Sequence, residues 1–199
     1  MRITVLLFDQ FETLDVFGPV EIFGRLTDLF TIRFASLHGG MIGNQHGVSH
    51  PTVSLKEVED STDLFLIPGG YGTRPLVDDE EWIDAIKKVA EGSTYVLTVC
   101  TGTALLARTG LLDGREATSN KKAFQWVVSN GAKVQWNKRA RWVVDGKYYT
   151  SSGVTAGMDM SLGFIELIHG SALAEQVAKD IEYCWIRDKD NDSFVAIEQ

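Results

Sequence analysis

The sequence has few of the features that mark membrane, secreted or nucleic-acid-binding proteins. Its 199 residues include only two cysteines, Cys100 and Cys184, which form neither a CxxC motif nor a disulfide framework. No apolar run approaches the length of a membrane span, and the N-terminal apolar stretch is too short and too quickly acidic for a signal peptide. These absences predict a cytoplasmic protein with reduced thiols and no membrane contact.

Basic residues are in the minority, with 19 lysines and arginines against 27 acidic residues and a net charge of −8. An acidic chain without a basic run is poorly suited to nucleic acid or anionic lipid, so we expect neither as a partner. Three histidines, His38, His46 and His50, lie close in sequence but do not follow a standard spacing of metal ligands. We therefore expect no metal and no other cofactor.

What the sequence does contain is an alternation of strand and helix patterns over its whole length. Its size and its 44% hydrophobic content suit one domain covering residues 1–199. The patterns predict strands at 3–8, 30–35, 63–67 and 94–99, a hairpin at 141–150, and helices at 79–91, 101–107, 124–128, 154–168 and 172–185. A first helix is expected from about Gly18, because Pro19 suits a first turn. Strands that alternate with helices predict an α/β fold with a mostly parallel sheet covered on both faces.

Cys100 is the strongest candidate for a catalytic residue, because it lies where a buried strand is predicted to end and a helix to begin. Enzymes of the α/β-hydrolase class use such a strand–turn–helix elbow to expose a nucleophile. Ligands of parallel sheets bind beyond the carboxyl ends of the strands, and Cys100 lies at such an end. The start of a helix should lower the pKa of this thiol and favour the reactive thiolate. A cysteine can also be a small core residue, which is the interpretation we prefer for Cys184 in the last predicted helix.

Four segments of the chain resemble the DJ-1/PfpI superfamily (ThiJ/PfpI, class I glutamine amidotransferase-like). They are residues 11–19 (FETLDVFGP), 67–70 (IPGG), 99–114, which include VCTG and GLLDG, and 150–159 (TSSGVTAGMD). The similarity is to the branch that contains isonitrile hydratases and the amidase-like sensor domains of some transcription regulators. It implies a flavodoxin-like, doubly wound sheet between helices, with a nucleophilic cysteine at the elbow. It also implies a homodimer, with the active site near the subunit interface.

The resemblance implies roles for individual residues. Cys100 is the nucleophile, and Asp15 matches an acidic residue near its sulfur, although an aspartate ahead of a helix is also a common N-cap. A carboxyl beside a thiolate is a like-charge pair, so the pKa of one group should rise. Gly69 and Gly70 follow a strand end, where their N–H groups and that of Thr101 are expected to bind an anion, unless the glycines form a plain turn. The Thr101 hydroxyl is expected to hold a water or the substrate.

Two positions differ from the pattern of related branches. Thr101 stands where protease-like and DJ-1-like members often carry histidine, so a Cys–His pair is not available there. Asn120 stands where many members of the nearer branch carry histidine, and its amide cannot act as a base at neutral pH. Asp159 lies near the start of a helix, where we expect a capping or dipole role in preference to a place in the cavity.

These residues favour an enzyme that acts on a small-molecule substrate. The resemblance implies an isonitrile hydratase-like lyase, in which Cys100 adds to the terminal carbon of R–NC and Asp15 supplies a proton, giving an N-formyl amide. Amide hydrolysis and glyoxalase-like chemistry are alternatives within the enzyme class. The alternative class is a non-catalytic sensor of a small molecule or of oxidants, the latter through oxidation of Cys100. The related regulators carry a helix-turn-helix region, which we do not expect in a chain that ends at Gln199.

Overall fold

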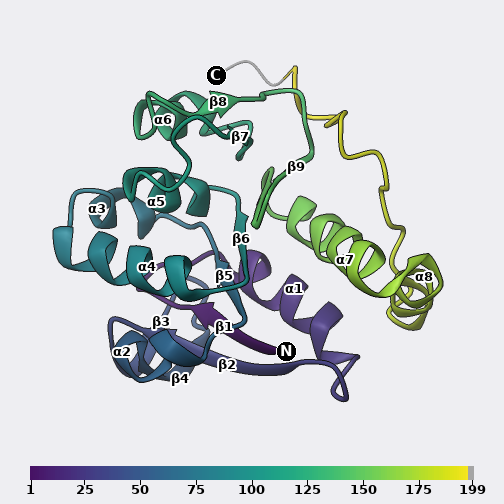
Figure 1. Ribbon diagram of the computed structural model, residues 1–199, viewed down its shortest axis with the longest axis horizontal. Coiled ribbons are helices and arrows are strands. Elements are labelled where there is room, and N and C mark those ends of the chain that lie inside the picture. Colours follow the sequence, from purple (N-terminus) through teal and green to yellow (C-terminus); the bar gives the residue numbers. More distant parts are fainter. Residues whose placement is uncertain (197–199) are drawn as a thin grey trace.

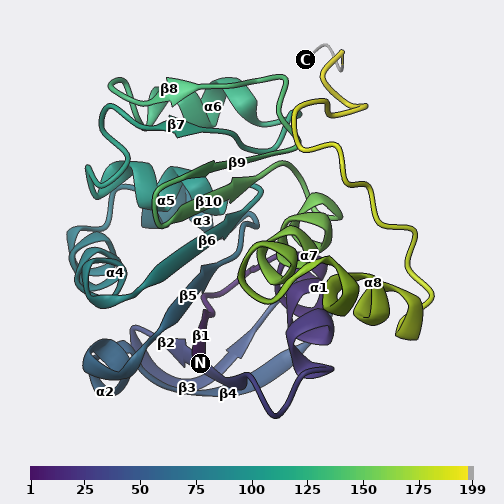
Figure 2. The same cartoon turned by 45° about the vertical axis from the view of Figure 1, so that its right-hand side comes forward.

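The computed structural model describes residues 1–196 and, within them, shows a sheet of eight strands with helices on both faces (Figures 1 and 2). The strand order is β3-β4-β2-β1-β5-β6-β10-β9. The strands are β1 (Arg2–Leu6), β2 (Thr31–Ser36), β3 (His38–Gly43), β4 (Ser49–Ser54), β5 (Leu64–Ile67), β6 (Tyr95–Val99), β9 (Trp142–Asp145) and β10 (Tyr148–Ser151). Neighbouring strands from β4 to β10 run parallel, whereas the edge strands β3 and β9 run antiparallel to theirs. The predicted α/β fold with a mostly parallel sheet is therefore confirmed.

The helices form two layers. On one face of the sheet lie α1 (Thr13–Gly24), α7 (Ala156–His169) and α8 (Ser171–Asp180), and on the other lie α2 (Leu55–Val58), α4 (Glu80–Gly92) and α5 (Gly102–Arg108) (Figure 2). The remaining elements are α3 (Thr73–Leu76), α6 (Phe124–Ser129), the 3-10 turn η1 (Glu59–Ser61), and the paired strands β7 (Glu116–Ala117) and β8 (Gln135–Trp136) beside α6. Strand β5 and most of β1 are buried, as apolar strands covered on both faces should be. Within the described residues, no helix combines the length and the apolar character needed to cross a membrane.

The first helix begins earlier than the sequence predicts. α1 starts at Thr13 and contains Pro19 in its second turn. A proline there removes one helical hydrogen bond, to the carbonyl of Asp15, while the helix still buries apolar residues such as Ile22. The expected start near Gly18 is wrong, because this burial outweighs one missing hydrogen bond. The earlier start places Asp15 in the first turn of α1.

The last helix ends earlier than predicted. α8 stops at Asp180, and Glu182 adopts a left-handed backbone with φ of 51°, which a right-handed helix does not contain. The chain then crosses toward α7, where the N–H of Ile186 donates a hydrogen bond to Asp159. Cys184 is therefore exposed on an irregular segment, and its expected place in the core of a helix is wrong.

Candidate active site

Cys100 occupies the turn between β6 and α5, at the predicted elbow. Its backbone is left-handed, with φ of 58°, which costs a residue with a side chain about 1–2 kcal/mol. The N–H of Cys100 lies 3.2 Å from the carbonyl oxygens of both Ser151 and Ser152. The hydroxyl of Ser119 donates to the carbonyl oxygen of Cys100 at 2.6 Å. Gly102 brings the elbow close to β5, because a Cβ atom there would lie 2.4 Å from a carbonyl oxygen of that strand. Surrounding structure thus holds the strained turn in place.

Asp15 is fully buried beside this elbow. Its Oδ2 accepts a hydrogen bond from the N–H of Gly69 at 2.9 Å, whereas Oδ1 has no hydrogen-bond partner among the described residues. Glycine is required at position 69, because a Cβ atom there would lie 2.8 Å from that oxygen and 2.6 Å from the backbone nitrogen of Thr101. The N–H of Gly69 therefore binds the Asp15 carboxyl, which corrects its expected role in binding an anion. Asp15 is also not the N-cap of α1, a position occupied by Glu12.

Burial sets the protonation of both groups. It raises the pKa of Asp15 to about 8, against the lowering effect of the hydrogen bond from Gly69. It also raises the pKa of the Cys100 thiol well above its ordinary value, and the N–H groups of Thr101 and Val154 oppose that rise only in part. The expected low pKa of the thiol is therefore wrong, because desolvation, with a smaller contribution from Asp15, outweighs the N–H groups that point toward the sulfur. At neutral pH the pair is a thiol beside a carboxylic acid.

Thr101 and Gly70 connect the elbow to the loop after β5. The N–H of Gly70 donates to the hydroxyl oxygen of Thr101 at 3.1 Å, and the hydroxyl of Thr73 lies 3.2 Å from the same oxygen. Gly70 is also a position for glycine alone, since its φ is 133° and a Cβ atom would lie 2.4 Å from the carbonyl oxygen of Gln10. The N–H of Gly70 is thus engaged by Thr101, although both residues border the cavity described next.

A cavity of about 610 Å³ has Cys100 in its wall, and its size is that of a small-molecule site. It is lined by Glu12, Gly70, Tyr71, Arg74, Cys100, Thr101, Asn120, Lys122, Ala123, Trp126 and Val154. Sequence analysis missed Arg74 and Trp126, although the guanidinium carbon of Arg74 lies 4.0 Å from the centre of the Trp126 ring. Their pairing is tertiary and leaves no pattern in the sequence. The position of Arg74, shortly after Gly70 and beyond the carboxyl end of β5, could have indicated that it lies near the ligand site.

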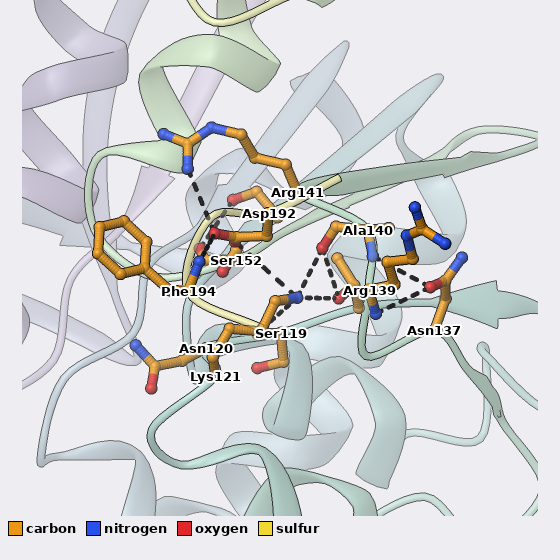
Figure 3. A network of polar contacts seen from close by, with 12 residues as sticks. Ser119, Asn120, Lys121, Asn137, Arg139, Ala140, Arg141, Ser152, Asp192 and Phe194 are labelled. Carbon is orange, nitrogen blue, oxygen red and sulfur yellow. Dashed lines mark hydrogen bonds and ion pairs between the residues drawn. The ribbon is translucent and has the colours of Figure 1, made fainter. Parts of the chain in front are cut away.

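A buried polar network joins Lys121, the neighbour of the cavity residues Asn120 and Lys122, to the C-terminal segment (Figure 3). The amine of Lys121 donates to the carbonyl oxygen of Ala140 at 2.6 Å and lies 4.0 Å from the carboxylate of Asp192. Arg141 lies 3.7 Å from Asp192 and donates from Nε to the carboxylate of Asp159 at 2.7 Å. Burial lowers the pKa of Lys121 to about 8, and the charge of Asp192 opposes this. Asp159 therefore belongs to this network, outside the lining of the cavity.

The three histidines from the N-terminal half do not converge. His46 lies 2.7 Å from the hydroxyl of Thr13, His38 faces a glutamate of α4, and the ring of His50 packs against Phe34. Within the described residues, no three side chains of the metal-ligating types come together.

Comparison with known proteins agrees with this architecture. A model described as the DJ-1/PfpI family matches residues 1–167. Isonitrile hydratase from Pseudomonas putida is 31% identical over 184 residues, which cover 92% of this chain and 78% of that protein. The chain belongs to the DJ-1/PfpI family. The crystal structure of a ThiJ/PfpI family protein from Pseudomonas syringae superimposes with a TM-score of 0.81 at 26% identity, over 92% of this chain and 74% of that one.

The DJ-1/PfpI family is not confined to enzymes. The HTH-type transcriptional regulator GbdR from Pseudomonas aeruginosa is 27% identical over 200 residues. The match covers 97% of this chain but 53% of the regulator, so the chain spans about half the length of that relative. Family membership therefore establishes the fold and leaves the specific activity to be argued from the site.

Asn120 has a local structural task in this member of the DJ-1/PfpI family. Its side-chain oxygen accepts a hydrogen bond from the N–H of Ala123 at 2.8 Å. The same side chain borders the cavity. The amide thus closes the turn before α6 and presents no base to the site.

Proposed function

We propose that the protein is a cysteine-dependent enzyme that hydrates an isonitrile, R–NC, to the N-formyl amide, R–NH–CHO. The observation that carries this proposal is a thiol in the cavity wall with a buried, protonated carboxyl beside it and no histidine directly after the cysteine. An isonitrile carbon needs both a nucleophile and a proton, which Cys100 and Asp15 supply. The similarity to an isonitrile hydratase supports the same chemistry. We expect the enzyme to work in the reducing cytoplasm, where the thiol persists.

In the first half-reaction, the sulfur of Cys100 forms a bond to the terminal carbon of R–NC. The thiol proton passes to Asp15 as the proton already held by Asp15 passes to that carbon. Oδ1 of Asp15 is suited to this exchange, because no hydrogen bond from the described residues occupies it. The product is a thioimidate, R–N=CH–S–Cys100, and Asp15 again holds one proton.

In the second half-reaction, water adds to the thioimidate carbon. Asp15 takes a proton from the water and delivers one to the nitrogen, while the hydroxyl of Thr101 orients the water at the cavity wall. The carbon–sulfur bond then breaks, Cys100 recovers its proton, and R–NH–CHO leaves. One water is consumed for each isonitrile, and no oxidant or reductant is needed.

The test is formation of the formamide from cyclohexyl isocyanide, followed by chromatography. Wild type and Cys184→Ser should turn over, because Cys184 is exposed and outside the cavity. Cys100→Ala should show no turnover, and Asp15→Asn should lose at least about a hundredfold in rate, as the removal of a general acid predicts. Wild type that makes no formamide, while Cys100 still reacts with a small alkylating agent, would reject the isonitrile assignment.

Sensing of a small molecule is the second candidate, and the match to half of a transcriptional regulator favours it. A sensor would bind its ligand in the same cavity without consuming it. Sensing of oxidants is less well supported, because Cys100 is only 7% exposed and burial raises its pKa. Calorimetry that shows binding of a ligand recovered unchanged after prolonged incubation would favour the sensor.

We also propose that the protein is a homodimer, on the basis of its resemblance to the DJ-1/PfpI superfamily. Light scattering should give twice the mass of one chain at micromolar concentration. A mass equal to one chain would contradict this proposal without affecting the assignment of Cys100 and Asp15.

A further inference from the structure

One wall of the cavity carries a guanidinium that aromatic side chains hold in place. Arg74 lies in the short helix α3, and its guanidinium carbon is 4.0 Å from the centre of the Trp126 ring and 5.7 Å from that of Tyr71. Stacking on aromatic faces restricts the plane of a guanidinium while leaving its N–H groups free to donate at the edge. Arg74 and Cys100 border the same cavity, so one small molecule can contact both.

Arg74 is paired differently from most arginines of this chain. Arg2, Arg25, Arg108, Arg115, Arg141 and Arg187 each form an ion pair with a carboxylate. Arg74 has no carboxylate within 4.0 Å among the described residues. Its hydrogen bonds there come from Nη1 alone, to the hydroxyl of Thr73 at 3.0 Å and to the carbonyl oxygen of Gly70 at 3.4 Å. Nε and Nη2 therefore remain available to a ligand.

The charge of Arg74 favours an anion at its wall of the cavity, although the chain as a whole is acidic, with a net charge of −8. The guanidinium of Arg74 lies at one wall, stacked on Trp126, and has no carboxylate within 4.0 Å among the described residues. Asp15 adds no charge at neutral pH because burial keeps its proton in place.

We propose that Arg74 binds a carboxylate group of the substrate while the reactive end of the same molecule meets Cys100. A guanidinium with two adjacent free donors matches the two oxygens of a carboxylate. The proposal rests on the proposed function for its reactive end, and names the substrate class as a small isonitrile that also carries a carboxylate. Arg74 is then the residue that distinguishes charged from neutral substrates.

The first test needs no isonitrile chemistry. Iodoacetate and iodoacetamide alkylate the same sulfur and differ in one carboxylate, so the ratio of their rates does not depend on the pKa of the thiol. Mass spectrometry of peptides measures this ratio at Cys100 and, as an internal reference, at the exposed Cys184. We expect the ratio at Cys100 to exceed that at Cys184 by about tenfold, and Arg74→Gln to remove most of this excess.

Two control variants make the result specific. Arg25→Gln removes one positive charge from an exposed pair on α1 and should leave the ratio unchanged. Arg74→Lys keeps the charge, loses the planar fork, and should give an intermediate ratio. Equal ratios at Cys100 in wild type and Arg74→Gln, in variants that fold normally by circular dichroism, would overturn the proposal.

The second test asks whether Arg74 contributes to turnover of a charged substrate. It compares kcat/KM for isocyanoacetate, which carries a carboxylate, with kcat/KM for its neutral ethyl ester. Wild type should prefer the acid in kcat/KM, and Arg74→Gln should lose about tenfold on the acid and less than twofold on the ester. Turnover of both compounds with no effect of Arg74→Gln would reject the subsite and keep the proposed function. Turnover of neither, with the alkylation preference intact, would reject the isonitrile chemistry and keep the carboxylate subsite.

Discussion

Two carboxyl groups of this protein are closed to solvent and differ in the groups that surround them. Asp15 and Asp159 each lie in the first turn of a helix, α1 and α7, and each is fully buried. Asp159 accepts hydrogen bonds from the guanidinium of Arg141, the hydroxyl of Tyr183 and the N–H of Ile186. Asp15 accepts a hydrogen bond from the backbone N–H of Gly69 and interacts with the Cys100 thiol, which lowers its pKa slightly, and its Oδ1 has no partner at hydrogen-bond distance among the described residues.

The comparison shows two ways to bury a carboxyl group. At Asp159 burial also raises the pKa of the carboxyl, but the hydrogen bonds from Ile186, Arg141 and Tyr183 and the charge of Arg141 oppose the rise, and the group ties the C-terminal segment to α7. At Asp15 the cost is avoided by keeping the proton, which raises the pKa to about 8. The first arrangement stabilises the fold, whereas the second keeps an acid ready beside Cys100 and the cavity. The groups that surround a buried carboxyl therefore distinguish a structural from a catalytic role better than the extent of its burial does.

The largest expected effect comes from breaking the structural pair. Arg141→Leu removes the guanidinium that faces Asp159 and Asp192 and leaves the buried carboxylate of Asp159 without a cationic partner among the described residues. We expect a loss of about 3–5 kcal/mol in the free energy of unfolding, measured by urea denaturation. The double variant Arg141→Met with Asp159→Leu should recover much of this loss, because it removes both charges. A loss below about 1 kcal/mol in Arg141→Leu would contradict the assigned role of the pair.

A smaller effect should appear in the pH dependence of stability. The ordinary pKa of an aspartate is 3.8 and that of folded Asp15 is about 8. Between these values the folded protein binds more protons at this site than the unfolded chain, so its contribution to stability falls as pH rises. The slope is up to about 1.4 kcal/mol per pH unit. Asp15→Asn lacks this titration, so urea midpoints between pH 5 and pH 7, within the window set by the two pKa values, should fall more steeply in wild type than in the variant. Parallel profiles would show that Asp15 is ionised in the fold.

The smallest effect concerns strain at the elbow. Cys100 has φ of 58°, a conformation that glycine adopts readily and alanine does not. Cys100→Gly should therefore be more stable than Cys100→Ala by about 0.5–1 kcal/mol, after the greater freedom of glycine in the unfolded chain is subtracted. Both variants lack the thiol, so thermal unfolding compares only the backbone. Greater stability of the alanine variant would show that the turn is unstrained.

Sequence reasoning succeeded where local pattern and tertiary structure agree. Buried apolar runs located β1, β5 and β6, and the end of β6 located Cys100 at a turn. Asp15 was found through the family resemblance alone, because its approach to the sulfur depends on the tertiary contact between α1 and the loop that follows β5. The sequence correctly predicted that Gly69 lies at the site. It did not predict the acceptor of the Gly69 N–H, which is the carboxyl of Asp15 and not a bound anion.

The wrong and missing predictions share a physical cause. Rules based on neighbouring residues in the sequence do not include how deeply a group is buried in the folded protein. The helix-start argument for the Cys100 pKa ignored desolvation, which dominates in the folded protein. The proline rule placed the start of α1 too late, because it does not count the apolar face of that helix. The contact of Arg74 with Trp126 joins segments far apart in sequence, and no periodicity reports it.

The central claim is that Asp15 stores a proton beside Cys100 at neutral pH. Infrared difference spectroscopy between wild type and Asp15→Asn tests it most directly, because a protonated carboxyl has a C=O stretching band separate from those of carboxylates. We predict such a band at pH 7, its loss as pH passes through about 8, and its absence from the variant. A spectrum at pH 7 in which the difference contains only carboxylate bands would contradict the claim.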